Sequence, residues 1–386
     1  MIITTRVKDI DKFLSLKDEW NRLLRESNSN NITLTWEWLY TWWKIYGNNR
    51  ELCIITVYED GVLVGLAPLL KIYRKRGYFK SFYFNSIEFL ASGEDEGHQI
   101  CSEYLDFIIL KGREQEILTH ILDYLTHQLV NEWDEIVLPD IKEESINFNI
   151  LRSYSKENGL RFTIQKTEPC SIAKLPSTWE DFLSSAPSSL RYKINRGRRE
   201  LEKLNSRYVE VKREDELNQA IKTLIELHQQ RWEGKGKPGG FASPQRRAFH
   251  QQIIPICLRN GWLKLCFLEI DNTPIGSLYN FKYNNKIYFY QSGIIPHKNK
   301  HLRPGLLLHS FGIEEAIKEG LHEYDFLKTG KSEYKYPWTN YTPNLLLIRI
   351  AKPGLKNSLY CFIEGFLDYL RKIKYFCERF ISKDKN

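Results

Sequence analysis

One stretch of the chain occurs twice, and this repeat constrains the fold more than any other feature. Residues 52–72 align without gaps on residues 263–283, so that Gly65 meets Gly276; the two sequences are LCIITVYEDGVLVGLAPLLKI and LKLCFLEIDNTPIGSLYNFKY. In each copy, alternating apolar residues lead into a polar turn and then into a strand that carries the glycine, which predicts a β-hairpin. A chance similarity between two hairpins is the alternative.

A helix and a strand follow the hairpin in both copies. In the first copy, an amphipathic segment at Ile117–Val130 precedes an apolar run at Glu135–Leu138, and in the second copy Leu306–Lys318 precedes Tyr324–Leu327. Two copies of one unit are the economical interpretation. The fold class we expect is therefore α/β (α+β), with two tandem units, each a twisted, mixed, mostly antiparallel sheet flanked by helices.

The length of the chain agrees with two domains, because 386 residues exceed what one hydrophobic core usually organises. We expect a first domain over residues 1–165, a second over 166–350, and a C-terminal amphipathic helix within 351–386. Apolar residues recur at helical spacing from Leu355 to Ile381, with basic residues near the end. Packing on the protein body or in a homodimer explains such a face, and contact with a membrane surface is the alternative.

The two copies differ in the loop that precedes the helix. The first copy has an acidic loop at residues 92–97, whereas the second has a basic loop at His297–Arg303, followed by Pro304 and Gly305 at the start of the helix. A helix N-terminus offers free N–H groups and the positive end of the helix dipole, which suits a diphosphate such as that of coenzyme A. We therefore place a donor site in the second copy only, at Lys300, His301, Arg303 and Gly305. An ordinary connection with a solvated basic loop is the alternative.

Positive charge is concentrated in the segment between the copies. Residues 186–213 contain nine Lys or Arg and three Glu, in a chain whose net charge is +8. A phosphate-bearing substrate held by residues such as Arg191, a nucleic acid, and a solvated helix face are the three interpretations. Nucleic acid is the least favoured, because the aromatic residues do not alternate with this basic run.

Several short motifs occur in an order that resembles a known family. They are Ser189-Leu190-Arg191 with Arg196 to Leu201, His228 to Trp232, Tyr290 to Gly293, Pro304-Gly305, Tyr324-Asp325-Phe326 with Gly330, and Tyr334-Lys335 with Trp338. In this order they resemble the acetyltransferase domain of the GNAT superfamily found in bacterial CelD-type cellulose-biosynthesis proteins. The resemblance covers Leu190 to Trp338 closely and the first half more loosely. It implies a GNAT-like fold. Together with the repeat and the acidic loop of the first copy, this predicts tandem GNAT-like domains, of which the first lacks a donor site.

The resemblance also implies the reaction and part of the site. The donor would be acetyl-CoA or another acyl-CoA, and the acceptor a small molecule of sugar type with an amine or hydroxyl group. Tyr290 and Gln291 would hydrogen bond the pantetheine arm, and Arg231, Trp232 and Tyr334 would face the acceptor. A core tryptophan with a surface arginine is the alternative for Arg231 and Trp232.

Acyl transfer needs a base and a group that stabilises the tetrahedral oxyanion. Asp325 is the candidate base, on a strand where Tyr324 and Phe326 point to the opposite face, and Glu333 is its competitor. A structural role for Asp325, capping a turn or pairing with Arg303, is the alternative. Lys335 follows a Tyr-Asp-Phe strand, as does a lysine of Fem-type peptidoglycan aminoacyl transferases that is thought to stabilise the transition state. The resemblance assigns that role to Lys335.

Composition indicates a cytoplasmic protein that uses no metal. The first residues are charged where a signal peptide needs an apolar core, and the cysteines form no C-x-x-C pair. His297 and His301 share a loop but have no third ligand nearby, so no metal is expected. The C-terminal segment would make the protein peripheral at the inner membrane face if it binds lipid.

Three functions remain open from the sequence. The first is an acyl-CoA-dependent N- or O-acyltransferase acting on a sugar, nucleotide-sugar or other cell-envelope precursor. The second is a non-catalytic accessory protein of polysaccharide biosynthesis that keeps the fold. The third is an aminoacyl-tRNA-dependent transferase of the Fem type.

Overall fold

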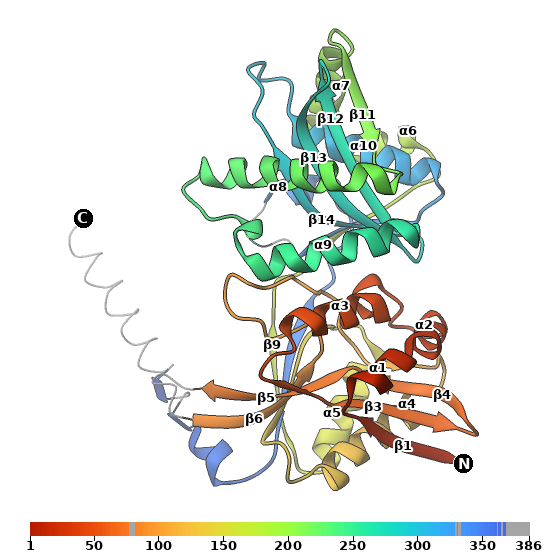
Figure 1. Ribbon diagram of the computed structural model, residues 1–386, viewed down its shortest axis with the longest axis vertical. Helices are drawn as coiled ribbons and strands as arrows, with labels where there is room; N and C mark the ends of the chain where they lie inside the picture. The colour runs from red at the N-terminus through yellow and green to blue at the C-terminus, as the bar shows by residue number, and fades with distance from the viewer. Residues whose placement is uncertain (77–81, 329, 331–332, 361, 364–365, 368–386) are drawn as a thin grey trace, which may run out of the picture.

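Two α/β units are stacked along the long axis of the molecule (Figure 1). The computed structural model describes residues 1–386 except 77–81, 329, 331–332, 361, 364–365 and 368–386. The N-terminus lies in the lower unit, called here the first unit, which contains β1 to β9 together with β16. The upper or second unit contains β10 to β15 and begins at Cys170. The expected mixed α/β fold with two similar units is therefore confirmed.

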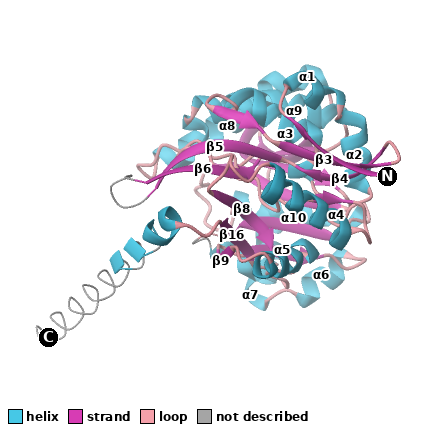
Figure 2. Ribbon diagram, turned by 90° about the horizontal axis from the view of Figure 1, so that it is seen from below, coloured by secondary structure: helices cyan, strands magenta, loops and turns pink. Residues whose placement is uncertain are grey.

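The first unit consists of two sheets flanked by helices. Its strands are β1 (Ile2–Val7), β2 (Arg50–Leu52), β3 (Ile54–Glu59), β4 (Val62–Ala67), β5 (Leu69–Arg76), β6 (Phe82–Phe89), β7 (Ile108–Ile109), β8 (Glu135–Lys142), β9 (Arg161–Lys166) and β16 (Leu345–Ala351). Its helices are α1 (Ile10–Ser15), α2 (Lys17–Arg25), η1 (Ile32–Leu34), α3 (Trp36–Tyr46), α4 (Glu114–Asp123), the π-helix η2 (Tyr124–Gln128) and α5 (Ile146–Glu157). The strand orders are β1-β3-β4-β7 and β2-β5-β6-β8-β16-β9, and several strands of the second sheet are seen from below in Figure 2.

The second unit has one sheet of order β10-β15-β14-β13-β12-β11. Its strands are β10 (Cys170–Lys174), β11 (Ser206–Glu210), β12 (Leu263–Ile270), β13 (Thr273–Tyr283), β14 (Lys286–Ile294) and β15 (Glu323–Lys328). Its helices are α6 (Trp179–Ser185), α7 (Ser188–Leu201), η3 (Glu214–Glu216), α8 (Leu217–Glu233), η4 (Gly240–Ala242), α9 (Pro244–Arg259), α10 (Pro304–Lys318) and η5 (Glu333–Trp338). Helices α7 and α10 pack on one face of this sheet, and α8 and α9 lie on the face turned toward the first unit.

The repeat read from the sequence is present in the geometry of both hairpins. In the first unit β3 pairs with β4 so that Val57 lies opposite Gly65, and in the second β12 pairs with β13 so that Leu268 lies opposite Gly276. Directly after these pairs, both registers shift by a β-bulge. A bulge at the same position is a strong sign of a shared backbone, because an extra residue changes the direction of the strand.

The repeated glycine has the same function in both units, which is to admit a helix. A Cβ atom on Gly65 would lie 2.2 Å from Ile117 Cγ2 of α4, and one on Gly276 would lie 2.8 Å from Leu308 Cδ1 of α10. Both distances are shorter than carbon atoms tolerate, so the close approach of each helix to its hairpin depends on a residue without a side chain. Helices α4 and α10 are thus equivalent parts of the two units.

The chain crosses between the units more than once. Strand β16 follows the second unit in sequence, yet it pairs antiparallel with β8 and β9 of the first unit. In the second unit, β10 comes first and pairs with β15. The domain boundaries predicted at residues 165 and 350 stay predictions. Strand β16 lies at the end of the segment assigned to the second domain, but it belongs to the sheet of the first unit.

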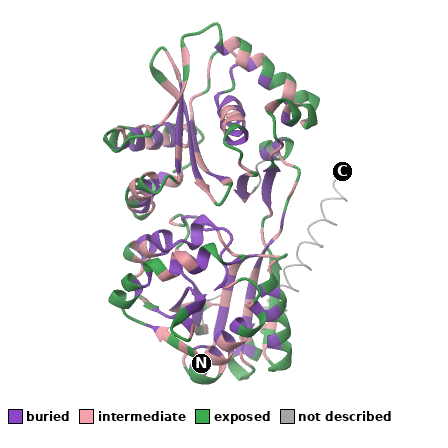
Figure 3. Ribbon diagram, turned by 90° about the vertical axis from the view of Figure 1, so that its right-hand side faces the viewer, coloured by how far each residue is buried: buried purple, intermediate pink, exposed green. Residues whose placement is uncertain are grey.

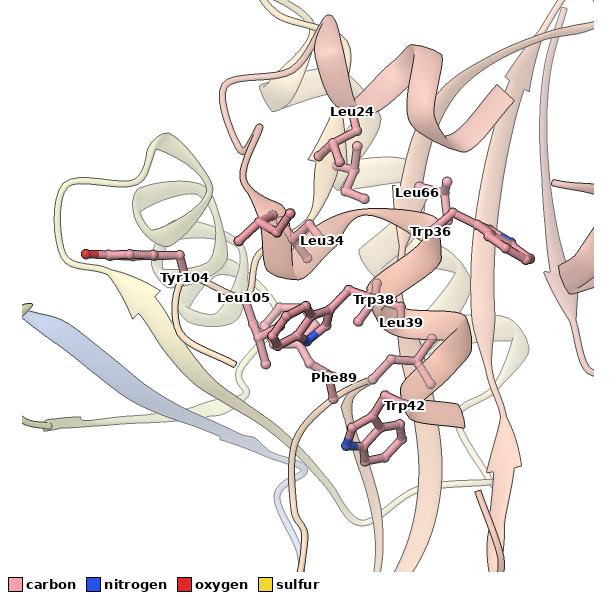
Figure 4. Packing of buried hydrophobic residues seen from close by; sticks show 14 of the residues in the cluster. Leu24, Leu34, Trp36, Trp38, Leu39, Trp42, Leu66, Phe89, Tyr104 and Leu105 are labelled. Carbon is pink, nitrogen blue, oxygen red and sulfur yellow. The ribbon is translucent and has the colours of Figure 1, made fainter. Parts of the chain in front are cut away.

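An aromatic cluster holds the two units together. Trp38 of α3 is 1% exposed, and its ring centroid lies 4.9 Å from that of Phe249, 5.4 Å from that of Phe281 and 6.0 Å from that of Tyr290. Figure 4 shows Trp38 among the buried residues of the first unit, with Trp36 and Trp42 on the same helix. The buried strands of both units are visible in Figure 3.

The C-terminal helix is described only in part. Residues 355–360 are helical, and Leu355 is 91% exposed. Most of the predicted helix up to Ile381 lies outside the described residues. Within the part of the chain that the structure describes, none of the helices is both long and apolar enough to cross a bilayer.

Candidate active site

The central feature of the second unit is a gap between two parallel strands. Strands β14 and β15 pair over only three positions, Lys286 to Tyr288 with Glu323 to Asp325, and then separate. Beyond this point β14 continues to Ile294 and β15 to Lys328. Two strands that separate in this way leave backbone groups along their facing edges for an extended ligand.

A cavity of about 300 Å³ lies beside this gap, at the start of α10. Its walls come from α7 (Ser189, Leu190, Lys193), α8 (Arg231), β14 (Ser292, Ile294), the start of α10 (Arg303, Gly305, Leu306, His309) and η5 (Tyr334, Pro337, Trp338). Four predicted site residues, Arg231, Arg303, Gly305 and Tyr334, are therefore neighbours in one cavity.

The cavity combines positive charge with a helix N-terminus. Helix α10 begins at Pro304, a residue favoured in a first turn, and no side chain caps it. The first N–H groups of the helix are free of intrahelical partners, and Arg303 and Lys193 add positive charge beside them. The cavity thus has the donors and the charge that a phosphate group requires.

Not all predicted donor residues reach this cavity. Lys300 and His301 are exposed on the loop and do not line it. Tyr290 points to the opposite face of the sheet, where its hydroxyl donates to the Ile100 carbonyl oxygen of the first unit. The side-chain oxygen of Gln291 accepts a hydrogen bond from the N–H of Ser292, and it is Ser292 that lines the cavity.

Lys335 lies at the gap between the two strands. It is 8% exposed, and its Nζ donates to the carbonyl oxygens of Phe326 and Lys328 at 2.6 Å each. Its Nζ is also 5.8 Å from the ring centre of Phe289 on β14. Burial lowers the pKa of Lys335, and two hydrogen bonds leave one of its three donors for another acceptor. The role that the resemblance implies for Lys335 stays a prediction.

His309 is a residue of this site that the sequence analysis did not identify. It lies on α10, is 3% exposed and lines the cavity. Its Nδ1 is 3.0 Å from the Tyr324 hydroxyl, and its ring packs edge-on against Phe289 at 4.6 Å. Burial, together with the charges of Lys335 and Arg231, lowers the pKa of His309 to about 3. The imidazole is therefore neutral in the physiological range.

Tyr324 and Phe326 point to the α10 side of the sheet, where their ring centroids lie 6.0 Å and 5.0 Å from that of His309, and Asp325 points to the opposite face, as the alternation of the strand predicts. Asp325 is 1% exposed. One carboxylate oxygen accepts from the Tyr104 hydroxyl at 2.6 Å, and the other accepts from the Leu327 N–H at 2.7 Å. Burial raises the pKa of Asp325, and these hydrogen bonds oppose the rise. Its assignment as the base stays a prediction, and both oxygens have structural partners.

A second buried carboxyl group reaches the same region from the first unit. Glu103 lies in the loop of residues 90–107 that follows β6, and it is 3% exposed. The charges of Lys328 and Lys335 act on it, and Lys328 pairs with Asp140 at 2.6 Å. Burial raises the pKa of Glu103 to about 7. The sequence offered no signal for this residue, because the loop has no periodicity.

The remaining predicted residues lie around the cavity. Arg191 donates to the carbonyl oxygens of Leu183 and Ser184 and does not line the cavity. Trp232 lies outside it, with Lys235 and Lys237 over its ring. Glu333 begins η5, but its side chain lies outside the described part of the structure.

A buried histidine joins α8 to the end of β14 beside the cavity. His228 is 0% exposed; its Nε2 accepts from the Gly240 N–H at 3.0 Å, and its Nδ1 lies 3.1 Å from the Ser292 carbonyl oxygen. Gly240 is a donor, so Nε2 carries no proton and Nδ1–H must be the donor to Ser292. Burial, together with the charges of Arg246 and Arg231, lowers the pKa of His228 to about 4.

The fold and the cavity define a protein with two similar α/β units, the second of which has a gap between parallel strands beside a helix N-terminus. Residues 188–336, which include every wall of the cavity except Pro337 and Trp338, match the family described as "Acetyltransferase (GNAT) domain". No curated protein matches the sequence.

Solved structures extend the fold similarity to the whole chain. FemX superposes with a TM-score of 0.63 at 13% identity, covering 94% of this chain and 100% of FemX. A conserved protein of unknown function from Bacteroides thetaiotaomicron has a TM-score of 0.55 at 12% identity, covering 91% of this chain and 100% of its own. L-PGS from Bacillus licheniformis has a TM-score of 0.50 at 9% identity, covering 92% and 96%. At these identities the similarity establishes the fold and not the substrate.

Proposed function

We propose that this protein is an acyl-CoA-dependent N- or O-acyltransferase whose donor binds in the cavity at the start of α10. The observation that carries the proposal is the meeting of a helix N-terminus, Arg303 and Arg231 in one cavity beside the gap between β14 and β15. The match of residues 188–336 to the acetyltransferase (GNAT) domain supports the same reaction class.

In this proposal each part of the cavity has a separate task. The N–H groups at Gly305 and the charge of Arg303 hold the diphosphate of the donor. The pantetheine arm then runs into the gap, so that the thioester carbonyl comes close to Lys335. The free donor of the Lys335 ammonium stabilises the oxyanion of the tetrahedral intermediate, because it is fixed in a buried site before the reaction begins.

The acceptor we propose is a sugar, a nucleotide-sugar or another precursor of a cell-envelope polysaccharide, as the resemblance to CelD-type proteins implies. A second cavity of about 350 Å³ lies between the units and contains many amide and hydroxyl side chains, including Asn28, Ser29, Asn31 and Asn147. Such groups suit a polyhydroxylated ligand, and this polar lining supports the acceptor class.

Aminoacyl transfer from tRNA is the second candidate, favoured by the whole-chain similarity to FemX. It predicts tRNA binding that weakens steeply with salt, since each phosphate contact releases counterions. A non-catalytic protein with this fold would bind neither donor.

Calorimetry with acetyl-CoA and with a long-chain acyl-CoA tests the proposal. The wild-type protein is expected to bind, and Arg303→Glu is expected to weaken binding about tenfold or more, equivalent to about 1.4 kcal/mol. Lys298→Glu is the matched control, because it makes the same charge change in the same loop at a residue that does not line the cavity. Its effect is expected to remain within about threefold.

The outcomes separate the candidates. No binding of either acyl-CoA by the wild-type protein contradicts the proposal, and tight salt-sensitive tRNA binding in the same preparation supports the second candidate instead. Equal losses for Arg303→Glu and Lys298→Glu would mean that general surface charge, and not the cavity, governs donor binding.

A further inference from the structure

Glu103 is a buried acid, and one of its two carboxyl oxygens is unsatisfied among the described residues. It is 3% exposed, and its Oε2 has no hydrogen-bond partner within the part of the chain that the structure describes. The backbone around it is fixed, since the Glu103 carbonyl oxygen accepts from the Thr33 hydroxyl at 2.7 Å. An unsatisfied buried carboxyl oxygen is costly, about 1–3 kcal/mol or more. A native structure keeps such a group mainly where a ligand or a reaction uses it.

The surroundings of Glu103 bring together residues from several elements. The titratable groups that interact with it are Lys328 on β15, Lys335 on η5, Asp140 on β8, Cys101 on its own loop, Cys170 on β10 and Tyr290 on β14. Of these, Cys101 is exposed, so solvent reaches the same loop two residues before Glu103. The positive charges of Lys328, at the end of β15, and of Lys335, in η5, both act on the carboxyl group.

Lys335 connects Glu103 to the donor cavity. Its Nζ is bonded to the carbonyl oxygens of Phe326 and Lys328 and approaches the Phe289 ring, which packs on His309 at the cavity wall. On the other side, Glu103 is the opposite charge that acts most strongly on Lys335. The cavity therefore lies on the α10 side, and the loop that carries Glu103 meets β15 from the first unit, where the neighbouring Tyr104 hydroxyl donates to Asp325 at 2.6 Å.

We propose that Glu103 of the first unit is the catalytic base for acyl transfer in the second unit. The proposal rests on the function proposed above. The acceptor nitrogen or oxygen attacks the thioester carbon and forms the new C–N or C–O bond, while its proton passes to the Glu103 carboxylate. The C–S bond then breaks, coenzyme A leaves as the thiolate, and the proton passes from Glu103 to solvent.

The chemical state of Glu103 suits this step. With a pKa of about 7, the carboxylate is half formed at neutral pH and is more basic than an ordinary glutamate. Asp325 is less suited, because its two oxygens already accept from Tyr104 and from the Leu327 N–H. The first unit then supplies a reacting group as well as scaffold.

The experiment compares full-length wild type with Glu103→Gln, Glu103→Asp and Glu94→Gln. Glu94 is a matched control from the same loop, half-buried and bonded to Trp42 Nε1 at 2.7 Å, with no part in the site. Acetyl-CoA binding is measured by calorimetry, and thiol release is measured across pH 5.5–9 with D-glucosamine as the probe acceptor and with water alone. Infrared difference spectra of wild type against Glu103→Gln report the titration of the carboxyl group itself.

Three results are expected together. The rate of thiol release by wild type rises with pH through about 7. The rate of Glu103→Gln is about 100-fold lower or more, while its Kd for acetyl-CoA is unchanged. The rate of this variant no longer depends on pH near 7. Glu103→Asp keeps a reduced rate with a pH-dependent profile, and Glu94→Gln keeps the wild-type profile. The infrared band of a protonated carboxyl group disappears between pH 6 and 8 in wild type and in Glu94→Gln, and this change is absent in Glu103→Gln.

The proposal is overturned if Glu103→Gln keeps the wild-type pH profile, or if the infrared spectra show Glu103 already ionised at pH 5.5. In the first case acetyl-CoA binding and thiol release by the wild type still support the donor cavity. Failure of the wild type to bind acetyl-CoA overturns the proposed function, and with it the role of Glu103.

Discussion

The buried imidazole of His228 makes the stability of the second unit dependent on pH. Its neutral form is required, because Nε2 accepts from Gly240 and the ring is 0% exposed. The unfolded chain takes up a proton at His228 near pH 6.5, whereas the folded chain does so only near pH 4. The unfolded state therefore binds more protons between these values, and stability is lost as the pH falls from 6.5 to 4.

The size of the effect is set by the shift. A difference of about 2.5 pKa units corresponds to about 3 kcal/mol over the whole range, and about 2 kcal/mol of this is lost between pH 7.5 and pH 5. His228→Gln removes the titration while keeping one donor and one acceptor. The free energy of unfolding of the variant minus that of wild type should therefore be about 2 kcal/mol more positive at pH 5 than at pH 7.5.

Urea unfolding followed by tryptophan fluorescence measures this difference at both pH values. His127→Gln is the control, since His127 is exposed and its side chain is 65% accessible. A stability difference between wild type and His228→Gln that is the same at both pH values would refute the reasoning. A His127→Gln difference that changes as much as that of His228→Gln would refute it as well.

Two further predictions concern single contacts. Asp325→Ala should lower the free energy of unfolding by about 2–4 kcal/mol, because it leaves the Tyr104 hydroxyl without its buried acceptor, while Asp325→Asn should cost about half as much and keep the rate of acyl transfer within about tenfold of wild type. Urea unfolding measures the stability of both variants, and thiol release measures acyl transfer. Loss of acyl transfer in a stable Asp325→Asn variant would support Asp325 as the base. Gly293→Ala should destabilise the second unit by about 2–4 kcal/mol, because the new Cβ would lie 2.6 Å from the backbone nitrogen of His228 in α8. Amide hydrogen exchange should show faster opening of α8. Unchanged exchange would contradict the contact.

Much of the fold could be predicted from the sequence because it rests on local rules. The repeated hairpin was recognisable from Gly65 and Gly276, since a close helix approach leaves a glycine in each copy. The start of α10 was recognisable from its proline, which is favoured in a first turn. Such signals depend on the backbone of a few neighbouring residues, and a sequence shows them directly.

The parts of the site that could not be predicted depend on strand irregularity or on distant segments. A β-bulge on β14 leaves Tyr290 out of the register between Phe289 and Gln291, so simple alternation does not give the direction of these side chains. His309 falls among apolar residues of a helix and looks like a core position until the cavity is known. Glu103 reaches the gap from another unit, and no local pattern predicts a contact over such a sequence separation.

The two units resemble each other in backbone and differ around the equivalent strands β6 and β14. In the first unit β6 also pairs with β8 over three positions, but Glu88 there pairs with Arg74, and Glu135 on β8 pairs with Arg76. Both ion pairs use a glutamate of the paired stretch of β6 and β8. After β14 the chain forms the basic loop at the donor cavity, whereas after β6 it forms the longer loop that carries Glu103 to the second unit. If the second unit binds the donor and the first unit supplies the base, acyl transfer needs both units. Neither unit alone should then transfer an acyl group.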